Sequence, residues 1–346
     1  MRSSLSNAVG HTRQKPVRAA GRSIAQHLRS AYPWLILIFT TSCALFPYFT
    51  DNVGLRESVL LAAVYVTLAS NLNLMIGYAG YVNFGNIVFF GLGGYVCVYL
   101  ATAWHWHLVL AALIGGAFVS LLALGFGLGI LRLRGAFFAL ATIGVNEAVR
   151  AFITNFEPWG GATGIYLSLD AYAPLGGPMQ GLWIAYFLIV IIMGLSLLLS
   201  YSVKKSKFGL GLMAIGQNED AAAILGVRTP LYKALAYSLS AYLPAVAGGV
   251  YFFKSGIIEP AGAFDLTTSI EAIVMVMLGG AGTVTGPALG AFLYEELRGF
   301  LLVSETFSHF QLVLAGVLLL AIVLFVPGGL MGWLQRRFAR LTGWLE

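Results

Sequence analysis

Six ionisable residues lie inside long apolar stretches of this 346-residue chain, where a charge is costly and is a candidate for a proton relay or a transport path. They are Glu147, Arg150, Glu271, Glu295, Glu296 and Arg298. Glu147 and Arg150 are three residues apart, so they can pair on one helix face, which favours a structural role. Glu271 stands alone in its apolar stretch. A proton-coupled transporter would use such an acid, and we take Glu271 as the strongest functional candidate of the six.

The sequence contains no pattern typical of a catalytic site, a metal site or a cofactor site, and we expect none of the three. The phosphate-binding pattern Gly-x-x-x-x-Gly-Lys-[Ser/Thr] is absent, so the chain is not expected to bind ATP by such a loop. His105 and His107 flank Trp106 between two apolar stretches, an arrangement typical of a membrane interface. Cys43 and Cys97 lie inside apolar stretches and are predicted to be buried free thiols.

Two glycine-rich segments interrupt apolar stretches: Leu74–Gly85 (LMIGYAGYVNFG) and Val276–Gly286 (VMLGGAGTVTG). Irregular backbone at membrane depth is tolerated only where protein or a water-filled cavity satisfies it, and paired glycine breaks are typical of transport paths. Close helix packing through glycine is the alternative interpretation. The residues that we expect near a translocation path are Asn83, Asn86, Glu271, Gly77, Gly80, Gly279 and Gly282.

The composition predicts the elements that hold these residues. Hydrophobic residues make up 59% of the chain and charged residues 10%, against about 25% charged in soluble proteins. We therefore predict an all-α integral membrane protein with about ten transmembrane helices, two of which end in the glycine-rich breaks. The predicted spans are 33–49, 58–76, 84–102, 108–131, 135–153, 181–202, 231–253, 266–280, 286–303 and 309–326.

The distribution of basic residues predicts the orientation. With a cytoplasmic N-terminus, every cluster of Lys and Arg falls on the cytoplasmic side, and the Gly/Pro-rich segment 154–180 lies outside. This division gives a basic cytoplasmic tail over 1–32, a membrane domain over 33–330 and a second cytoplasmic tail over 331–346. Both termini are then cytoplasmic. The net charge of +6 is explained by these clusters, so we do not expect nucleic-acid binding.

The loop Lys204–Pro230 is the longest predicted on the cytoplasmic side. It begins with a basic patch and continues as a predicted short helix, Met213–Leu225, which Gly226 ends. Small alanines would let this helix approach a partner closely, and its acidic and amide side chains offer polar contacts. An ordinary helix at the membrane interface is the alternative interpretation.

The segment Asp220–Gly226 (DAAAILG) resembles the Glu-Ala-Ala-x-x-x-Gly loop of ABC importer permeases, which docks on an ATPase subunit. Other motifs, in matching order, resemble the LivM branch of the branched-chain amino-acid ABC permease family over residues 55–332. They are Asn71–Leu74 (NLNL), the run from Leu131 to Thr142, Gly160–Gly164 (GGATG), Ser206–Gly209 (SKFG), Asn218–Ala222 (NEDAA), Tyr232–Lys233, Leu278–Pro287 and Pro327–Leu330 (PGGL).

The resemblance implies a permease subunit in a bacterial or archaeal cell membrane, the inner one where there are two. An external solute-binding protein would deliver amino acids, with branched-chain amino acids as the expected substrate. Separate ATPase subunits and a second, LivH-like permease chain would complete the complex. The residues expected to couple to the ATPase are Asn218, Glu219, Asp220, Ala221, Ala222 and Gly226.

Two departures from the family pattern bear on these expectations. Asp220 stands where the general loop pattern has glutamate. The sequence of Tyr81–Asn86 (YVNFGN), at the end of the first break, differs from the more common sequence of the family, which leaves urea, short amides or other amino acids open as substrates. A stand-alone transporter coupled to protons or sodium would also explain the breaks and Glu271, but not the docking-like loop. A channel or structural membrane protein predicts no such loop at all.

Overall fold

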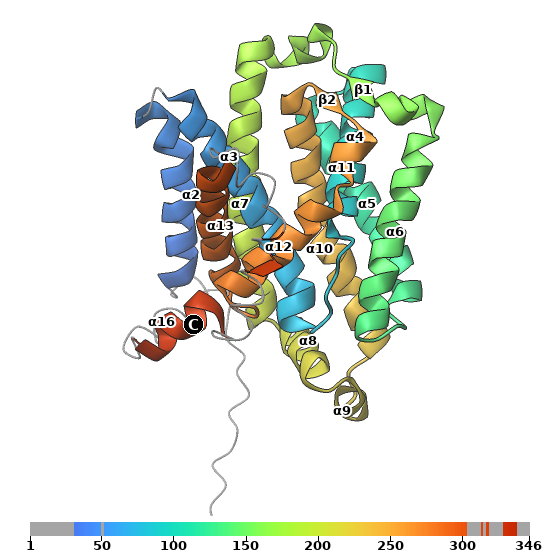
Figure 1. Ribbon diagram of the computed structural model, residues 1–346, viewed down its shortest axis with the longest axis vertical. Coiled ribbons are helices and arrows are strands. Elements are labelled where there is room, and N and C mark those ends of the chain that lie inside the picture. Colours follow the sequence, from blue (N-terminus) through green and yellow to red (C-terminus); the bar gives the residue numbers. More distant parts are fainter. Residues whose placement is uncertain (1–30, 50–51, 303–312, 314–315, 318–327, 338–346) are drawn as a thin grey trace, which may run out of the picture.

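The chain folds into a bundle of helices. The computed structural model describes residues 31–49, 52–302, 313, 316–317 and 328–337. In this part of the chain the helices run mostly along the long axis of the molecule (Figure 1). Two short strands, β1 (Ile165–Tyr166) and β2 (Ile257–Ile258), pair antiparallel at one end. Apart from these two-residue strands, the regular structure of the described residues is helical, and the predicted all-α membrane fold is confirmed.

Eight stretches among the described residues are long and apolar enough to cross a membrane. They are α2 (Ala31–Phe49), α3 (Val53–Asn73) with the π-helix η1 (Leu74–Tyr78), α4 (Asn86–Ala103), α5 (Leu108–Ile130), α6 (Ala136–Thr154), α7 (Pro178–Lys205), α10 (Thr229–Ser255), and α11 (Pro260–Ala263) followed by α12 (Leu266–Gly279). The predicted ninth span corresponds to α13 (Gly286–Leu302), which has 17 residues. The tenth, 309–326, lies almost wholly outside the described residues, so the count of ten stays a prediction.

The core of the bundle lies where α4 crosses α10. A Cβ atom on Gly93 would overlap the backbone of Ala245, and a Cβ on Gly248 would overlap the carbonyl of Phe90. Without a hydrophobic driving force between helices in lipid, such small residues let two backbones approach closely and gain packing contacts. Helices α3, α4 and α10 are the most buried, whereas α2 and α6 leave most of their residues at the surface. The central helices therefore form the scaffold on which both breaks are held.

The loops divide between the two ends of the bundle as predicted. The segment between α6 and α7, with the short 3₁₀ helices η2 (Glu157–Trp159), η3 (Gly161–Thr163) and η4 (Leu169–Leu175), lies at the end that carries β1 and β2 (Figure 1). Helices α8 (Lys207–Gln217), α9 (Glu219–Ile224) and α16 (Gly329–Arg337) lie at the opposite end. Which end faces the cytoplasm stays a prediction.

The predicted single helix Met213–Leu225 is wrong, because α8 and α9 are separate helices. Asn218 between them has an extended backbone (φ −160°, ψ 110°), and its side-chain oxygen accepts a hydrogen bond from the backbone N–H of Ala221 at 3.0 Å. Asn is a favoured residue at a helix N-terminus for this reason, and Glu219 and Asp220 follow in the first turn, where the helix dipole favours acids.

Candidate transport path and coupling loop

The two glycine-rich breaks meet in the structure. The first begins as η1, a π-helical turn, and π-helical turns are frequent at functional sites. Asn73, just before η1, accepts a hydrogen bond from the backbone N–H of Gly282 at 2.9 Å and donates one to the carbonyl of Thr283 at 2.8 Å. Residues 280–285 connect α12 to α13, so this one side chain joins the end of α3 to the second break.

Glycines permit this approach. A Cβ on Gly77 would overlap the backbone nitrogen of Gly282 and the side chain of Asn73. A Cβ on Gly279 would overlap the carbonyl of Gly286 at the start of α13. Three of the four glycines predicted near the path thus lie at the contact between the breaks or at the turn that forms it. Both alternatives for these glycines, a path and close packing, stay compatible with this contact.

Gly80, the fourth glycine, does not lie at the contact between the two breaks but next to helix α8. It has a positive φ of 74°, which glycine adopts without strain. A Cβ on it would lie 3.3 Å from the Cα of Gly216, near the end of α8. The segment that follows η1 is therefore in contact with the predicted coupling loop.

Asn83 and Asn86 are both buried near the start of α4. The side-chain oxygen of Asn83 accepts from the backbone N–H of Gly85 at 3.0 Å. Its side-chain nitrogen, and the side-chain oxygen of Asn86, have no hydrogen-bond partner among the described residues. Buried polar groups usually have one, so these two amides have spare capacity for a water molecule or a substrate. Their place on a translocation path stays a prediction.

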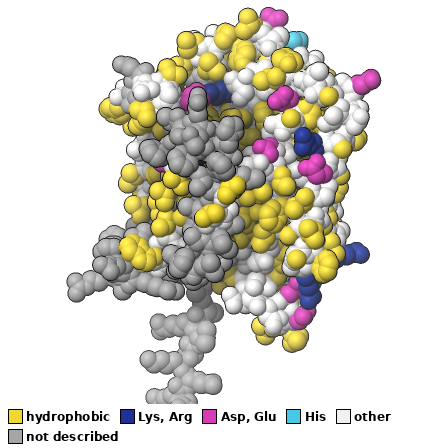
Figure 2. All heavy atoms as spheres, in the orientation of Figure 1, with side chains coloured by type: hydrophobic (Ala, Val, Ile, Leu, Met, Phe, Trp, Pro, Cys, Tyr) yellow, Lys and Arg dark blue, Asp and Glu magenta, His cyan; other side chains and the backbone are white. Residues whose placement is uncertain are grey.

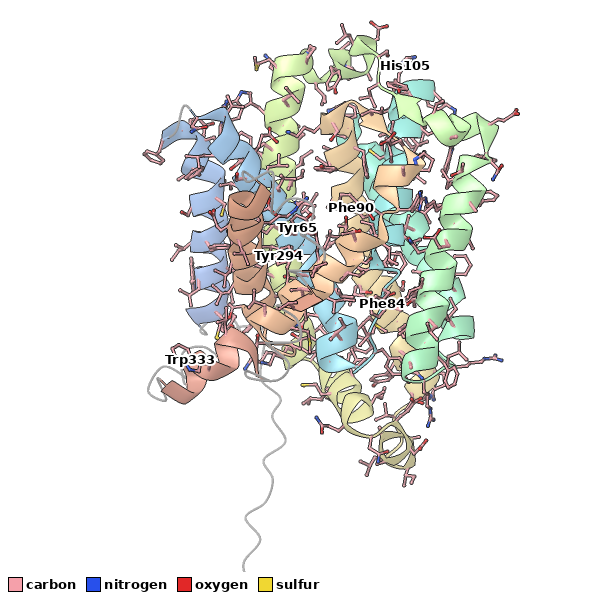
Figure 3. All side chains as sticks on the ribbon, viewed as in Figure 1. Tyr65, Phe84, Phe90, His105, Tyr294 and Trp333 are labelled. Atoms are coloured by element: carbon pink, nitrogen blue, oxygen red, sulfur yellow. The ribbon has the colours of Figure 1, made fainter. Side chains whose placement is uncertain are left out.

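Glu271 is held in a cluster of polar side chains between α3, α12 and α13. Its carboxylate accepts a hydrogen bond from the hydroxyl of Tyr65 at 3.0 Å and lies 3.8 Å from the guanidinium of Arg298. Arg298 also donates to Tyr65 at 3.1 Å and lies 3.5 Å from Glu295. Because of these contacts Arg298 is turned towards the bundle, which the sequence did not indicate. Tyr294 of α13 lies at the level of Tyr65 (Figure 3).

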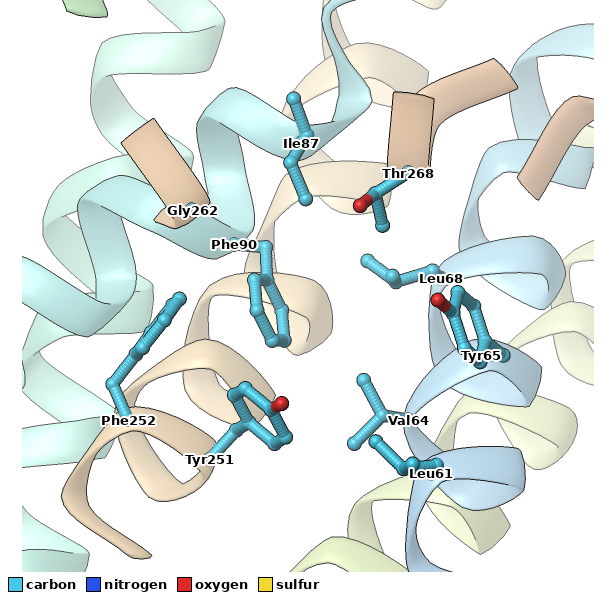
Figure 4. Close-up of a pocket in the computed structure, with 10 residues that line it drawn as sticks. All are labelled: Leu61, Val64, Tyr65, Leu68, Ile87, Phe90, Tyr251, Phe252, Gly262 and Thr268. Carbon is cyan, nitrogen blue, oxygen red and sulfur yellow. The ribbon is translucent and has the colours of Figure 1, made fainter. Parts of the chain in front are cut away.

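A cavity of about 190 Å³ lies beside this cluster (Figure 4). Its walls come from α3, α4, α10 and the α11–α12 segment, and Phe90 and Tyr251 point into it. Most of the lining is aliphatic or aromatic, with hydroxyl groups from Tyr65, Tyr251 and Thr268. A site of this kind suits a small, mainly apolar molecule that carries few polar groups.

The predicted coupling loop is fastened to the bundle by Lys233 of α10. The Lys233 ammonium lies 2.7 Å from the carboxylate of Glu219, and it also donates to the carbonyl of Leu131 at 2.7 Å and to the hydroxyl of Tyr81 at 3.0 Å. Tyr81 in turn donates to Glu219 at 2.6 Å. The Lys233 side chain is only 3% exposed, and a buried ammonium is tolerated only when it is paired and hydrogen-bonded in this way.

The charges around Glu219 keep it ionised. Burial alone would raise the pKa of Glu219, but hydrogen bonds from Lys233 and Tyr81, with the charges of Lys233 and Arg134, hold it below its usual range. Arg134 contacts Glu219 at 3.2 Å and Asp220 at 3.0 Å. Burial and the Glu219 carboxylate raise the pKa of Tyr81, so its phenol stays protonated and acts as the donor. The cluster therefore pairs Lys233 and Arg134 with the carboxylates of Glu219 and Asp220.

The remaining coupling residues divide between anchors and surface. Ala222 is buried at 2% exposure, so it packs against the protein itself, whereas Ala221 is exposed. Gly226 (φ 90°) ends α9 as predicted, because the backbone N–H groups of Gly226 and Val227 donate to the carbonyls of Ala223 and Ala222. The tip of α9 presents Ile224 and Leu225, which are 87% and 81% exposed.

Sequence reasoning did not assign Asn73, Tyr81, Arg134 or Lys233 to the site. A signal existed for Lys233, since it is a charge at the edge of an apolar stretch, and for Asn73, since it is an amide directly before the first break. For Tyr81 and Arg134 the distance along the chain from Glu219 left no signal in the sequence. Ile224 and Leu225 fell inside the predicted helix Met213–Leu225, which gave them no separate role, whereas both are exposed in the structure.

Comparisons with known proteins place the chain. It is 25% identical over 310 residues to the high-affinity branched-chain amino acid transport system permease protein LivM of Escherichia coli K12, which covers 82% of this chain and 71% of that protein. It is 32% identical over 150 residues to the autoinducer 2 import system permease protein LsrC of Salmonella paratyphi B, which covers 42% of this chain and 43% of the relative. No solved structure matches the chain. Residues 54–323 match the family model described as branched-chain amino acid transport system / permease component, and the chain, a multi-pass membrane protein, belongs to this family of transport permeases.

Proposed function

We propose that the chain is the membrane-spanning subunit of an ABC importer for amino acids, with branched-chain amino acids as the substrate. The permease itself hydrolyses nothing. Separate ATPase subunits bind the end of the bundle that carries α8 and α9, and an external solute-binding protein delivers the substrate to the opposite end. Family membership supports the permease role, and the features below support the finer assignments.

The observation that carries the proposal is the exposed apolar tip of α9. Ile224 and Leu225 project from the end of the bundle, while Glu219 and Ala222 of the same helix are fixed to the protein. Two large apolar side chains on a loop outside the membrane are costly to leave in water and typical of a contact surface. A firmly anchored helix with an apolar tip is suited to a groove on a cytoplasmic ATPase.

The cavity beside Glu271 supports a substrate with a small apolar side chain. Its aliphatic and aromatic lining would offer contacts to a branched side chain, whereas urea and short amides would leave their polar groups with few partners there. The relative from Escherichia coli is named for branched-chain amino acids, which agrees with this chemistry. We therefore favour an amino acid over the smaller polar solutes.

The surface of α6 supports a second permease chain. Glu147 and Arg150 pair at 3.9 Å on this helix, as predicted, but their side chains are 55% and 42% exposed. Figure 2 shows charged side chains set among hydrophobic ones on the face towards α6. Charged side chains within a membrane span are rarely left against lipid. A polypeptide that covers this face would remove that cost, and a second permease subunit is the partner that we propose.

The alternative is a stand-alone transporter driven by protons or sodium, for which Glu271 would carry the coupling ion. Its hydrogen bond with Tyr65 and its proximity to Arg298 favour a structural or gating role for this carboxylate over an uncommitted proton site. The α9 tip has no role in such a transporter.

The test is reconstitution of the permease in vesicles with and without its ATPases, second permease and solute-binding protein, with leucine as the probe. Uptake that requires ATP and all the subunits is expected. Leucine uptake by this chain alone under a proton or sodium gradient would replace the proposal with the secondary-transporter alternative. Failure of the ATPases to co-purify with the unmutated chain would exclude the docking role of α9.

A further inference from the structure

We propose that Lys233 and Tyr81 are positioning residues that transmit movement of α9 to the first glycine break. This inference rests on the proposed function, since it assumes that an ATPase moves α9. It adds a specific route: the docking loop acts on the end of η1, and through it on the loop between α12 and α13. No substrate contact is assigned to either residue.

The first step of the route is the fastening of α9. This helix has six residues and follows Asn218, whose extended backbone separates it from α8. A helix that short is not rigidly oriented by its own backbone when an extended residue precedes it. Glu219, in its first turn, is fixed by Lys233 at 2.7 Å and by Tyr81 at 2.6 Å. Any displacement of α9 therefore pulls directly on these two side chains.

The second step leads from Tyr81 to the break. The backbone N–H of Tyr81 donates to the carbonyl of Met75 inside η1 at 2.9 Å, so the residue is part of the turn that closes the π-helix. One residue earlier, Gly80 contacts Gly216 of α8. The Lys233 ammonium also lies 4.8 Å from the centre of the Tyr81 ring, a distance at which a cation is attracted to the ring face. Both the side chain and the backbone of Tyr81 are thus held.

The third step crosses to the second break. Directly before η1, Asn73 forms its two hydrogen bonds with Gly282 and Thr283. The contacts therefore form a continuous series from α9, through Tyr81 and η1, to the loop that begins α13. Continuity alone does not show coupling, which requires that a change at one end alters the other. The experiment must measure that change.

Anchoring of the loop does not depend on Lys233 alone. Leu212 and Ile215 of α8 are buried against the bundle, and Arg134 contacts both Glu219 and Asp220. Loss of the Lys233 contact would therefore leave the loop folded and α9 in place for docking, but no longer stiffly connected to Tyr81. A role confined to stability predicts instead that the ATPase is lost together with coupling.

The readout is the rate at which a cysteine at Val82 reacts with a soluble maleimide. Val82 follows Tyr81 and is exposed, and the natural cysteines Cys43 and Cys97 are buried, so they contribute little background. The purified complex with its ATPases is labelled with and without a non-hydrolysable ATP analogue. In the protein whose only substitution is Val82→Cys, we expect the ATP analogue to change the labelling rate.

Tyr81→Phe and Lys233→Met are then introduced separately. The first removes one hydroxyl and keeps the ring. The second leaves Glu219 with Arg134 as its partner. In both variants we expect the nucleotide-dependent change in the labelling rate of Val82→Cys to shrink about tenfold, because each variant loses a hydrogen bond to a charged group. ATPase retention should stay at the unmutated level. Lys207→Met, on the exposed start of α8, and Tyr166→Phe, in the exposed strand β1, are the matched controls and should leave the change intact.

The outcomes separate this inference from the proposed function. If the unmutated complex retains its ATPases but both variants keep the full nucleotide-dependent change, the inference is overturned and the proposed function stands. The same holds if nucleotide never alters labelling at Val82. If Lys233→Met fails to accumulate, the milder Tyr81→Phe decides. If the unmutated chain retains no ATPase at all, the proposed function fails and the inference fails with it.

Discussion

Asn73 and Gly282, 209 residues apart in the chain, are joined by a hydrogen bond of 2.9 Å from the Gly282 backbone N–H to the Asn73 side-chain oxygen. The same side chain donates to Thr283 at 2.8 Å. Backbone groups freed by a helix break at membrane depth need partners inside the protein or in a water-filled cavity. Asn73 supplies two of them, so the second break is stabilised by the residue that directly precedes the first.

The first prediction concerns this junction. Asn73→Ala would leave the N–H of Gly282 and the carbonyl of Thr283 without their partner, at a cost of about 1–3 kcal/mol for each group that stays unsatisfied. We expect a lower thermal unfolding midpoint for the detergent-purified permease and lower uptake. Asn155→Ala, which removes an exposed amide at the end of α6, is the control. An unchanged midpoint for Asn73→Ala would mean that water replaces the side chain without cost.

The second prediction separates the tip of α9 from its anchor. Ile224→Ser with Leu225→Ser removes the exposed apolar surface, so we expect the ATPase to be lost while the permease keeps its unfolding midpoint. Ala222→Trp inserts a large ring where Ala222 is buried, and overpacking of this kind costs about 1–3 kcal/mol. We expect that variant to disturb the loop itself. Co-purification and thermal unfolding are measured on both; retention of the ATPase by the double serine variant would contradict docking through this tip.

The helices and the two breaks were predictable from the sequence because both depend on local patterns. Apolar stretches the length of a bilayer gave the spans, and glycine in place of larger residues marked the ends of η1 and α12. The Glu147–Arg150 pair was predictable for the same reason, because side chains three residues apart on a helix are neighbours on its surface.

The contacts between distant segments were not predictable. Glu219 was assigned to an ATPase contact, and nothing in its neighbourhood along the chain indicated that Lys233 and Tyr81 would bury it. The helix Met213–Leu225 was predicted as one element because its residues favour helix throughout. The N-terminal capping preference of Asn218 outweighed that tendency and started a separate helix, whose end leaves Ile224 and Leu225 exposed.

The third prediction is the orientation of the bundle. Thr163 in η3 and Leu225 at the tip of α9 are exposed at opposite ends. With Lys and Arg clusters on the cytoplasmic side, Thr163→Cys should react with an impermeant maleimide in intact cells, and Leu225→Cys only after the membrane is opened. The buried cysteines Cys43 and Cys97 allow both experiments in the natural background. The reverse pattern of labelling would invert the topology and place the docking loop outside.

The fourth prediction tests the partner on α6. Leu140 and Ala151 are exposed on the same side of the helix as Glu147. Cysteines at these two positions should form cross-links to a second permease chain in membranes. Ile191→Cys, exposed on α7, should not. Cross-linking at Ile191 but not on α6 would move the interface to α7 and leave Glu147 and Arg150 to be covered in another way.

The last prediction is the pH dependence of the α9 anchor. The pKa of Glu219 is lowered by Lys233, Tyr81 and Arg134 against the opposing effect of burial, so the carboxylate is charged in the folded loop at any pH where it is charged in the unfolded chain. Its contribution is therefore fully present above the usual glutamate pKa of about 4.3 and is lost only as the pH falls through the lower folded value.

We expect a cysteine in place of the buried Ala222 (Ala222→Cys) to be labelled slowly, at a constant rate from neutral pH down to that range, once corrected for thiolate reactivity with an exposed reference cysteine at Thr163. Below that range its labelling rate should rise as α9 loosens. In Glu219→Gln the charge is absent at every pH, so the rise tied to Glu219 should disappear and the neutral-pH rate should already be higher. Asp220 is the other acid in the cluster, and it is exposed and paired only with Arg134 among the described residues. If Asp220→Asn, and not Glu219→Gln, removed the pH dependence, the anchor would lie at the surface pair and not at the buried Lys233.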